Sequence, residues 1–264
     1  MSQATFYTQS SMIATAQDKI HDMFEKMSTF SNAYQALIYF FGYGCGVLLQ
    51  NLYGGSMELS SSLMKENTAT NLPLVDDIRN NYNTLVQSGG NYSPNGYEAT
   101  AAKKILQDAN EILFNVFANP NFGGNSSLQD SVQSSLKNFV GGRTFSTPFL
   151  VTINGFPATV FVPQFQINPA RIGGLAQELS GQVFTSSGAP AYGTPEYQTW
   201  VTKQQEWTTD LNQLSTDLTD YNQGWQASSK YSENMFKVDM STLHDFLKDM
   251  TTEWNFEIQQ MRSS

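Results

Sequence analysis

The sequence has little charge, little cysteine and no cluster of basic residues. Charged residues make up 14% of the 264 residues, and the formal net charge is −9. Binding to a phosphate backbone depends on clustered Lys and Arg, so nucleic acid is not an expected partner. Cys45 is the only cysteine, which excludes an internal disulfide. A lone thiol inside an apolar run is typical of a small buried side chain.

Motifs that carry catalysis or hold cofactors are also missing. The sequence contains no Gly-x-Ser-x-Gly, P-loop, His-Glu-x-x-His or Cys-x-x-Cys. Its two histidines, His21 and His244, lie far apart, and the carboxylates near each are typical of a solvated helix face. We therefore expect no enzyme activity, no catalytic or metal-binding residue and no cofactor. An unrecognised active site would require a pocket lined by His21 or His244 with carboxylates.

The start of the chain has no basic residue before Lys19. A Sec-type signal peptide begins with positive charge, so we do not expect one here. Residues 1–10 are polar and are expected to be disordered. The chain is then either secreted without a cleaved signal peptide or cytoplasmic.

The C-terminal segment 196–264 has the most regular pattern in the sequence. It contains no proline and one glycine, Gly224. Apolar residues recur at alternating spacings of three and four, which predicts a helix of roughly 100 Å at about 1.5 Å per residue. Residues 222–229 also suit a turn between two antiparallel helices, and both alternatives remain open. The expected helical seam comprises Trp207, Leu211, Leu214, Leu218, Tyr221, Trp225, Phe246, Met250, Trp254 and Ile258.

Residues 36–49 form the most apolar stretch, inside predicted N-terminal helices at 11–65. The stretch is shorter than the roughly 20 residues that span a bilayer, so a simple transmembrane anchor is not expected. Its glycines indicate close helix packing, and a surface buried only on assembly explains the stretch equally well. The candidate assembly or insertion residues are Leu37, Ile38, Phe40, Phe41, Gly42, Gly44, Gly46, Val47 and Leu48.

The middle region, 66–195, is expected to be mostly helical. Pro73 is expected to end the preceding helix, and helices are predicted at 74–86, 97–118, 127–140 and, more weakly, 168–184. Residues 148–162 predict the one β-hairpin, because β-branched and aromatic residues flank Asn154-Gly155. Pro157 should lie on an edge strand, and the hairpin should pack on helices or join another strand.

This layout resembles the EspA/SseB-type filament and needle-tip translocator proteins of bacterial type III secretion. The matching parts are Phe30 to Leu52, the following helix to Lys65, and Trp207 to Met261. The resemblance implies export through the type III apparatus, self-association through the terminal helices, a cytoplasmic chaperone before export and no catalysis. It also implies a secretion needle or a host membrane as a further partner.

The sequence thus predicts a mainly α protein with long N- and C-terminal helices. These helices are expected to pack as an antiparallel coiled coil or bundle, beside a small helical middle region that carries the hairpin. The first functional hypothesis is a non-enzymatic secreted filament, tip or translocator component that self-associates. The alternative is a soluble helical effector or pore-forming toxin that inserts residues 36–49 into a membrane.

Overall fold

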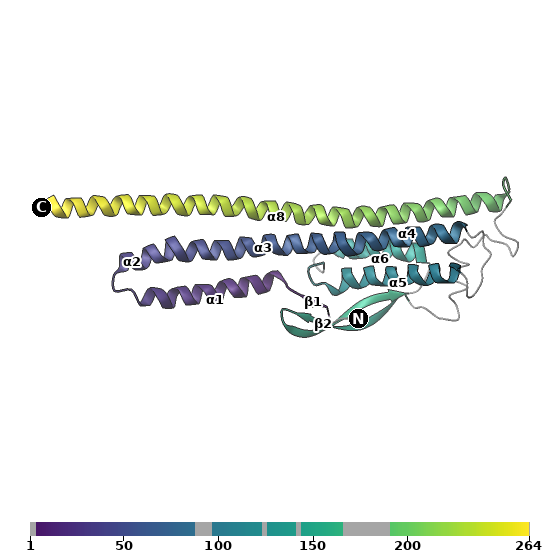
Figure 1. The fold of residues 1–264 in the computed structure, drawn as a ribbon, viewed down its shortest axis with the longest axis horizontal. Coiled ribbons are helices and arrows are strands. Elements are labelled where there is room, and N and C mark those ends of the chain that lie inside the picture. Colours follow the sequence, from purple (N-terminus) through teal and green to yellow (C-terminus); the bar gives the residue numbers. More distant parts are fainter. Residues whose placement is uncertain (1–3, 88–96, 123–125, 141–143, 166–190, 264) are drawn as a thin grey trace. The chain divides into compact units, whose positions relative to one another are not determined.

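A computed structural model of the chain describes residues 4–87, 97–122, 126–140, 144–165 and 191–263. The described part is mainly α, with long helices near both ends of the chain and one small sheet, as predicted (Figure 1). Its helices are α1 (Gln9–Ser28), α2 (Ala33–Ile38), α3 (Gly46–Glu66), α4 (Leu72–Gln87), α5 (Tyr97–Ala118), α6 (Ser126–Val140) and α8 (Pro195–Ser263). Two π-helical segments, η1 (Tyr39–Cys45) and η2 (Asn67–Asn71), join α2 to α3 and α3 to α4. The predicted helix at 168–184 lies outside the described residues.

The chain forms two compact units. Unit 1 comprises Met1–Phe6 and Lys65–Gln223, and unit 2 comprises Tyr7–Met64 and Gly224–Ser264. The first boundary nearly coincides with the predicted end of the N-terminal helices at residue 65. The predicted segment 196–264 is instead divided, because α8 contributes to both units.

Helix α8 runs without a break through residues 222–229. Of the two alternatives, the single long helix is therefore correct, and the predicted turn between two antiparallel helices is wrong. The side chain of Asn222, part of the expected turn signal, is used for packing. It accepts a hydrogen bond from Asn67 Nδ2 at 2.9 Å and donates one to Thr68 Oγ1 at 2.9 Å. A single glycine costs a helix only about 1 kcal/mol, and Gly224 alone therefore does not end α8.

Unit 1 contains a continuous apolar core between α4, α5, α6 and the first part of α8. Each helix contributes an amphipathic face with apolar residues at helical spacing, and these faces meet. The core includes fully buried residues from all four helices, namely Ile78, Ile105, Ile112, Leu113, Leu136, Leu211, Leu214 and Leu218.

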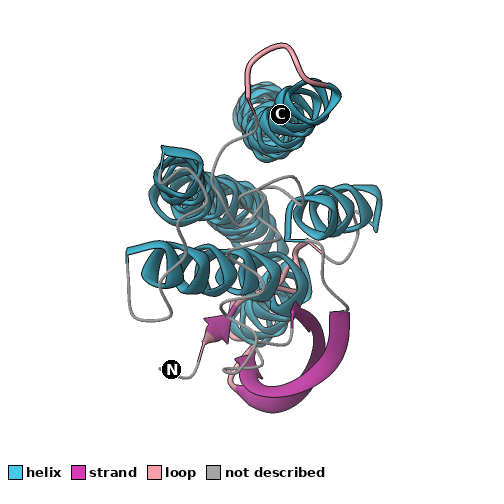
Figure 2. Cartoon of the chain, turned by 90° about the vertical axis from the view of Figure 1, so that its right-hand side faces the viewer, coloured by secondary structure: helices cyan, strands magenta, loops and turns pink. Residues whose placement is uncertain are grey.

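The strands of unit 1 form a three-stranded sheet in the order β1-β2-β3. Strands β2 (Thr144–Ile153) and β3 (Phe156–Phe165) are antiparallel and make a curved ribbon (Figure 2). Asn154 and Gly155 both have positive φ, 51° and 84°, as a type I′ turn requires. The predicted turn is confirmed, and the strands extend beyond 148–162 at both ends. Pro157 lies on β3, an edge strand as expected, and β3 packs against α5.

The N-terminal segment differs from the expected disordered start. Thr5–Phe6 form β1, which pairs in parallel with Thr152 and Ile153 of β2. Thr152 N donates to Ala4 O and Asn154 N donates to Phe6 O, both at 2.9 Å. The exposed edge of β2 thus supplies partners for a short polar segment that has no strand pattern of its own, and Phe6 becomes buried.

Pro73 does not end the helix before it, contrary to expectation. The helix is continuous from Ala33 to Thr84, and Pro73 is the second residue of α4. The π-helical segment η2 comes directly before α4. A proline ring is not accommodated inside a regular α-helix, because it lacks an N–H and clashes with the carbonyl four residues before it. The wider turn of η2 changes the hydrogen-bond pattern next to Pro73, so the helix can continue.

In unit 2, α1 and the α2–η1–α3 helix form an antiparallel helical hairpin (Figure 1). Phe30 of the connection contacts Tyr39, and Phe24 contacts Phe40, with ring centroids 5.3 and 6.1 Å apart. The C-terminal part of α8 packs antiparallel to the α2–η1–α3 helix, since contacts on α8 move toward lower numbers as those on its partner rise. Tyr34 stacks on Trp254, and Ser56 hydrogen-bonds Ser232.

Candidate functional site

Four of the five predicted seam residues on the unit 1 part of α8 are buried. Leu211, Leu214, Leu218 and Tyr221 are between 0% and 7% exposed. Tyr221 stacks on Phe122 with ring centroids 4.1 Å apart. The half-buried ring of Trp207 packs edge-on against Tyr82 at 5.1 Å. In unit 1 these residues therefore belong to the core, where they hold α8 to its own chain.

A buried network of asparagines adds a polar constraint to the unit 1 core. Asn67 Nδ2 donates to Leu218 O at 2.7 Å, and Asn71 Nδ2 donates to Asn67 Oδ1 at 2.9 Å. Asn115 Nδ2 of α5 donates to Asn71 Oδ1 at 2.8 Å. Buried amides keep their hydrogen bonds only in one relative position of the helices, so the network fixes the register of α8 against η2 and α5. No prediction from the sequence identified these residues, although asparagine at 67, 71 and 222 is unusual at apolar helix positions.

The part of α8 in unit 2 is covered much less. Phe246 contacts Phe41 at 4.6 Å and is 45% exposed, and Trp225, Met250, Trp254 and Ile258 are half-buried. Three further apolar residues, Tyr231, Val238 and Phe256, are 66%, 57% and 60% exposed. Their spacings of about two and five turns place them on one line of the helix, here called the outer ridge. Among the described residues of this part of α8, every apolar residue retains some exposure.

Two polar contacts accompany the aromatic ones in unit 2. The Tyr53 hydroxyl donates to Asp239 Oδ2 at 2.7 Å, and the Ser56 and Ser232 hydroxyl oxygens are 3.1 Å apart. The carboxylates near His244, which include Asp239, are expected on a solvated face, and the sequence does not predict this pairing. Only the antiparallel register of the two helices brings together residues so far apart in the sequence.

The apolar stretch around η1 is also partly exposed. Leu37 and Ile38 are 41% and 44% exposed, Tyr43 is 61% exposed, and Phe40, Phe41, Val47 and Leu48 are half-buried. Only Gly44 of the three predicted glycines is buried. A Cβ at Gly44 would lie 1.7 Å from Met23 Sδ, so glycine allows α1 to approach η1 there. A Cβ at Gly42 would make an ordinary 3.9 Å contact with Leu247, and one at Gly46 would meet nothing within 4 Å.

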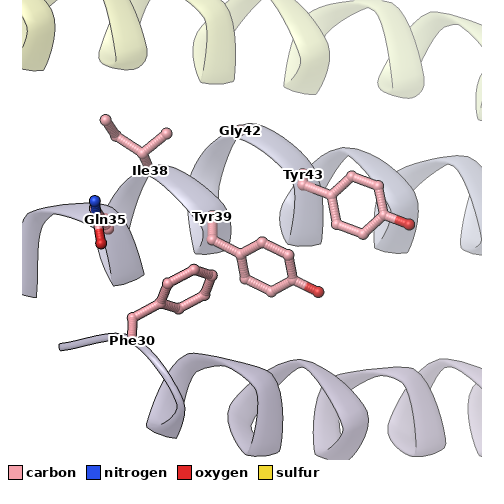
Figure 3. A pocket seen from close by; sticks show the side chains of 6 residues that line it. All are labelled: Phe30, Gln35, Ile38, Tyr39, Gly42 and Tyr43. Atoms are coloured by element: carbon pink, nitrogen blue, oxygen red, sulfur yellow. The ribbon is translucent and has the colours of Figure 1, made fainter. Parts of the chain in front are cut away.

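A pocket with a volume of about 400 Å³ lies beside this stretch in unit 2. It is lined by Phe30, Gln35, Ile38, Tyr39, Gly42 and Tyr43. In Figure 3 the rings of Phe30 and Tyr39 lie between this helix and α1, and Ile38 lies on the opposite side of the helix. The lining has no carboxylate, imidazole or thiol; it consists mainly of aromatic and aliphatic side chains, with the phenol groups of Tyr39 and Tyr43 and the amide of Gln35 as its polar side-chain groups, and it suits apolar contact.

The titratable groups of the described residues do not converge. His21 lies 3.6 Å from Glu25 on an exposed face of α1, and His244 is exposed on α8. The described residues contain no group of three or more His, Cys, Asp or Glu side chains placed to hold a metal ion.

One carboxylate in unit 1 is fully buried. Asp108 accepts a hydrogen bond from Lys104 Nζ at 2.7 Å, while its second oxygen, Oδ2, has no hydrogen-bond partner. Burial raises the pKa of Asp108, while the hydrogen bond to Asp108 raises the pKa of Lys104. The raised pKa of Asp108 means that its charged form is destabilised, whereas the raised pKa of Lys104 means that its charged form is stabilised. Because the Lys104 side chain is 46% exposed and that of Asp108 is 0% exposed, desolvation of Asp108 outweighs the attraction of the pair.

The apolar helix is longer than the stretch at 36–49 suggests. The described chain has one helix, Ala33–Thr84, that is long and apolar enough to cross a membrane by length and composition, and only 6% of its apolar window is buried. The absence of Asp, Glu, Lys, Arg and His between Lys26 and Glu58 is the sequence signal that would have revealed it.

Comparison of the chain with protein-family models, curated proteins and solved structures gives no match.

Proposed function

We propose that this protein is a non-enzymatic structural protein that acts by self-association through unit 2. The observation that supports the proposal is the contrast between the two parts of α8. One helix buries its leucines fully in unit 1, whereas its aromatic and aliphatic residues in unit 2 remain partly or largely exposed. Exposed apolar residues along a helix stabilise a protein when another helix covers them.

The charge of this part of α8 suits a second copy of the chain as the covering partner. Residues 224–264 carry six acidic and four basic side chains, and both signs occur along the length of the segment. Because both signs are present, two copies can align oppositely charged residues beside an apolar line, as coiled coils do. A strongly basic or strongly acidic partner would find no complementary surface here.

The resemblance of the chain's layout to type III secretion filament and translocator proteins suggests where this self-association takes place. We propose that the protein is a bacterial type III secretion filament, tip or translocator component, secreted without a cleaved signal peptide. A cytoplasmic chaperone would cover the exposed apolar residues of unit 2 before export, and the secretion needle is the further partner. Export is tested by expressing the full chain in a bacterium with an intact type III apparatus and in a strain that lacks its export ATPase. Equal amounts of protein outside both strains would refute this setting and leave self-association untouched.

Self-association is tested by sedimentation velocity over a wide range of protein concentration. We expect the average mass to rise with concentration, and Phe256→Lys on the outer ridge to suppress that rise. Phe161→Lys is the matched control, because Phe161 is a 67% exposed phenylalanine on β3 in unit 1. A native chain that stays monomeric at all concentrations, or equal effects of the two substitutions, would contradict the proposal.

A further inference from the structure

From Ala33 to Met57, the helix that lies between α1 and α8 in unit 2 lacks charge on all of its faces. No charged residue or histidine lies between Lys26 and Glu58, whereas α1 and α8, which flank this helix in unit 2, both carry acidic and basic side chains. A protein interface needs apolar residues on one helix face and leaves Lys and Glu free to occupy the opposite face. Lipid surrounds a helix and disfavours charge on every face. We infer that residues Ala33–Met57 insert into a lipid bilayer.

The length of this segment fits the bilayer. Its helix is continuous, and Ala33–Met57 spans about 37 Å at about 1.5 Å per residue, compared with a hydrocarbon core of about 30 Å. Tyr34 and Tyr53 lie about 28 Å apart along the helix, near the two positions where tyrosine is favoured at membrane interfaces. The π-helical segment η1 keeps its backbone hydrogen bonds within the helix, as insertion requires.

The contacts that hold this helix within unit 2 can be exchanged. They include the Tyr34–Trp254 stack, the Phe41–Phe246 contact and the Tyr53–Asp239 hydrogen bond. They leave Leu37, Ile38 and Tyr43 substantially exposed. Insertion therefore replaces a partial apolar contact with α8 by complete apolar surroundings.

The relevant partner is the hydrocarbon interior and not an anionic lipid surface. Basic residues are absent from the segment itself, and the net charge of the chain is −9. Insertion should consequently occur in neutral phosphatidylcholine vesicles, with no gain from added phosphatidylglycerol. The inference goes beyond the proposed self-association and does not rest on it, because the outer ridge of α8 lies on a different helix.

Cys45 provides the probe. It is the only cysteine and lies midway between Ala33 and Met57. The full chain is labelled at Cys45 with an environment-sensitive nitrobenzoxadiazole dye and mixed with phosphatidylcholine vesicles that carry a nitroxide at a shallow or a deep position of the acyl chain. We expect a blue shift of the dye emission, with stronger quenching by the deep nitroxide. Stronger quenching by the shallow nitroxide, or no shift, would overturn the inference.

Two substitutions separate insertion from self-association. Tyr43→Lys places a charge near the middle of the segment Ala33–Met57, at a position that is 61% exposed. Val238→Lys places a charge on the outer ridge of α8, at a position that is 57% exposed. A lysine at the centre of a membrane helix should weaken partitioning by about 100-fold. We expect Tyr43→Lys to abolish the vesicle-dependent shift and Val238→Lys to leave it intact, with the reverse pattern for sedimentation without lipid.

A reversible clamp gives a second test that does not depend on a new charge. Ser56→Cys and Ser232→Cys, in a Cys45→Ala background, place two thiols where the hydroxyl oxygens are 3.1 Å apart. The reduced protein should float with vesicles in a density gradient and the oxidised protein should not. Equal flotation of both forms would contradict exchange of the α8 contacts.

In the experiment with the dye on Cys45, a blue shift that appears at high protein concentration without vesicles would assign the segment to contact with a second copy of the chain and overturn insertion.

Discussion

The two parts of α8 should respond differently to the same leucine truncation. Leu218 is 0% exposed in unit 1, and Leu218→Ala removes roughly three carbons at about 0.8 kcal/mol each, about 2.4 kcal/mol. The remaining cavity adds to this loss, which brings the expected destabilisation to about 3–4 kcal/mol. Leu247 in unit 2 is only half-buried, so Leu247→Ala should cost about 1 kcal/mol or less in the monomer.

Hydrogen exchange in increasing urea can measure this difference unit by unit. Amides of α5 report on unit 1, and those of α3 before residue 64 report on unit 2. We expect Leu218→Ala to lower the free energy of opening at α5 at every protein concentration. Leu247→Ala should have a smaller effect, at α3, because Leu247 faces Gly42 of its own chain and is only half-buried there. Equal losses from the two substitutions at low protein concentration would refute the view that only unit 1 has a complete core.

Three further predictions concern single sites. Gly44→Ala should destabilise unit 2 by about 1–3 kcal/mol in chemical denaturation, because the side chain of Met23 must move. Gly46→Ala, the control, should be neutral or stabilising by up to about 1 kcal/mol. Similar effects of the two substitutions would contradict the close approach of α1 to η1 at Gly44. Asp108→Asn should stabilise unit 1 at neutral pH, because the raised pKa of Asp108 means that ionisation of this carboxyl destabilises the native state. The urea midpoints of the two proteins should converge as the pH falls toward about 4, the ordinary range of an Asp pKa, where the native carboxyl is protonated. A stabilisation by Asp108→Asn that grows on acidification would contradict a raised pKa of Asp108. Asn71→Ala should cost about 1–3 kcal/mol in urea denaturation because its neighbours lose buried hydrogen bonds, and an unchanged midpoint would remove the network from the core.

Local sequence patterns predicted much of the fold. The spacing of Leu211, Leu214 and Leu218 indicated a buried helix face, and Asn154-Gly155 located the hairpin turn. Both signals act over a few residues, through helical periodicity and backbone conformation, and do not depend on what packs against them.

Features that depend on distant parts of the chain were not predicted. The strand at Thr5–Phe6 exists because β2 offers a free edge, and continuation of the helix through Pro73 accompanies the π-helical turn at Asn67–Asn71. The continuity of α8 past Gly224 likewise could not be decided from local turn signals, because Asn222 is engaged by Asn67 and Thr68. Tertiary hydrogen bonds overrode local preference at each of these places except Pro73, where the backbone itself adapted.

The candidate surfaces were predicted only in part. The seam positions were identified, but their division into buried and half-covered parts depends on which helices lie beside α8 in each unit. The apolar stretch at 36–49 was identified too, but the uncharged segment extends further, from Met27 to Met57, because polar uncharged residues flank the apolar ones.

Photo-crosslinking between copies of the chain shows whether unit 2 self-associates in solution. A photo-reactive amino acid in place of Val238, on the outer ridge, is illuminated in solution and the products are separated by mass. We predict a product of two chains whose crosslink joins unit 2 of one copy to unit 2 of another, and no such product from the same amino acid at Phe161. Crosslinks from position 238 confined to its own chain would contradict self-association through unit 2.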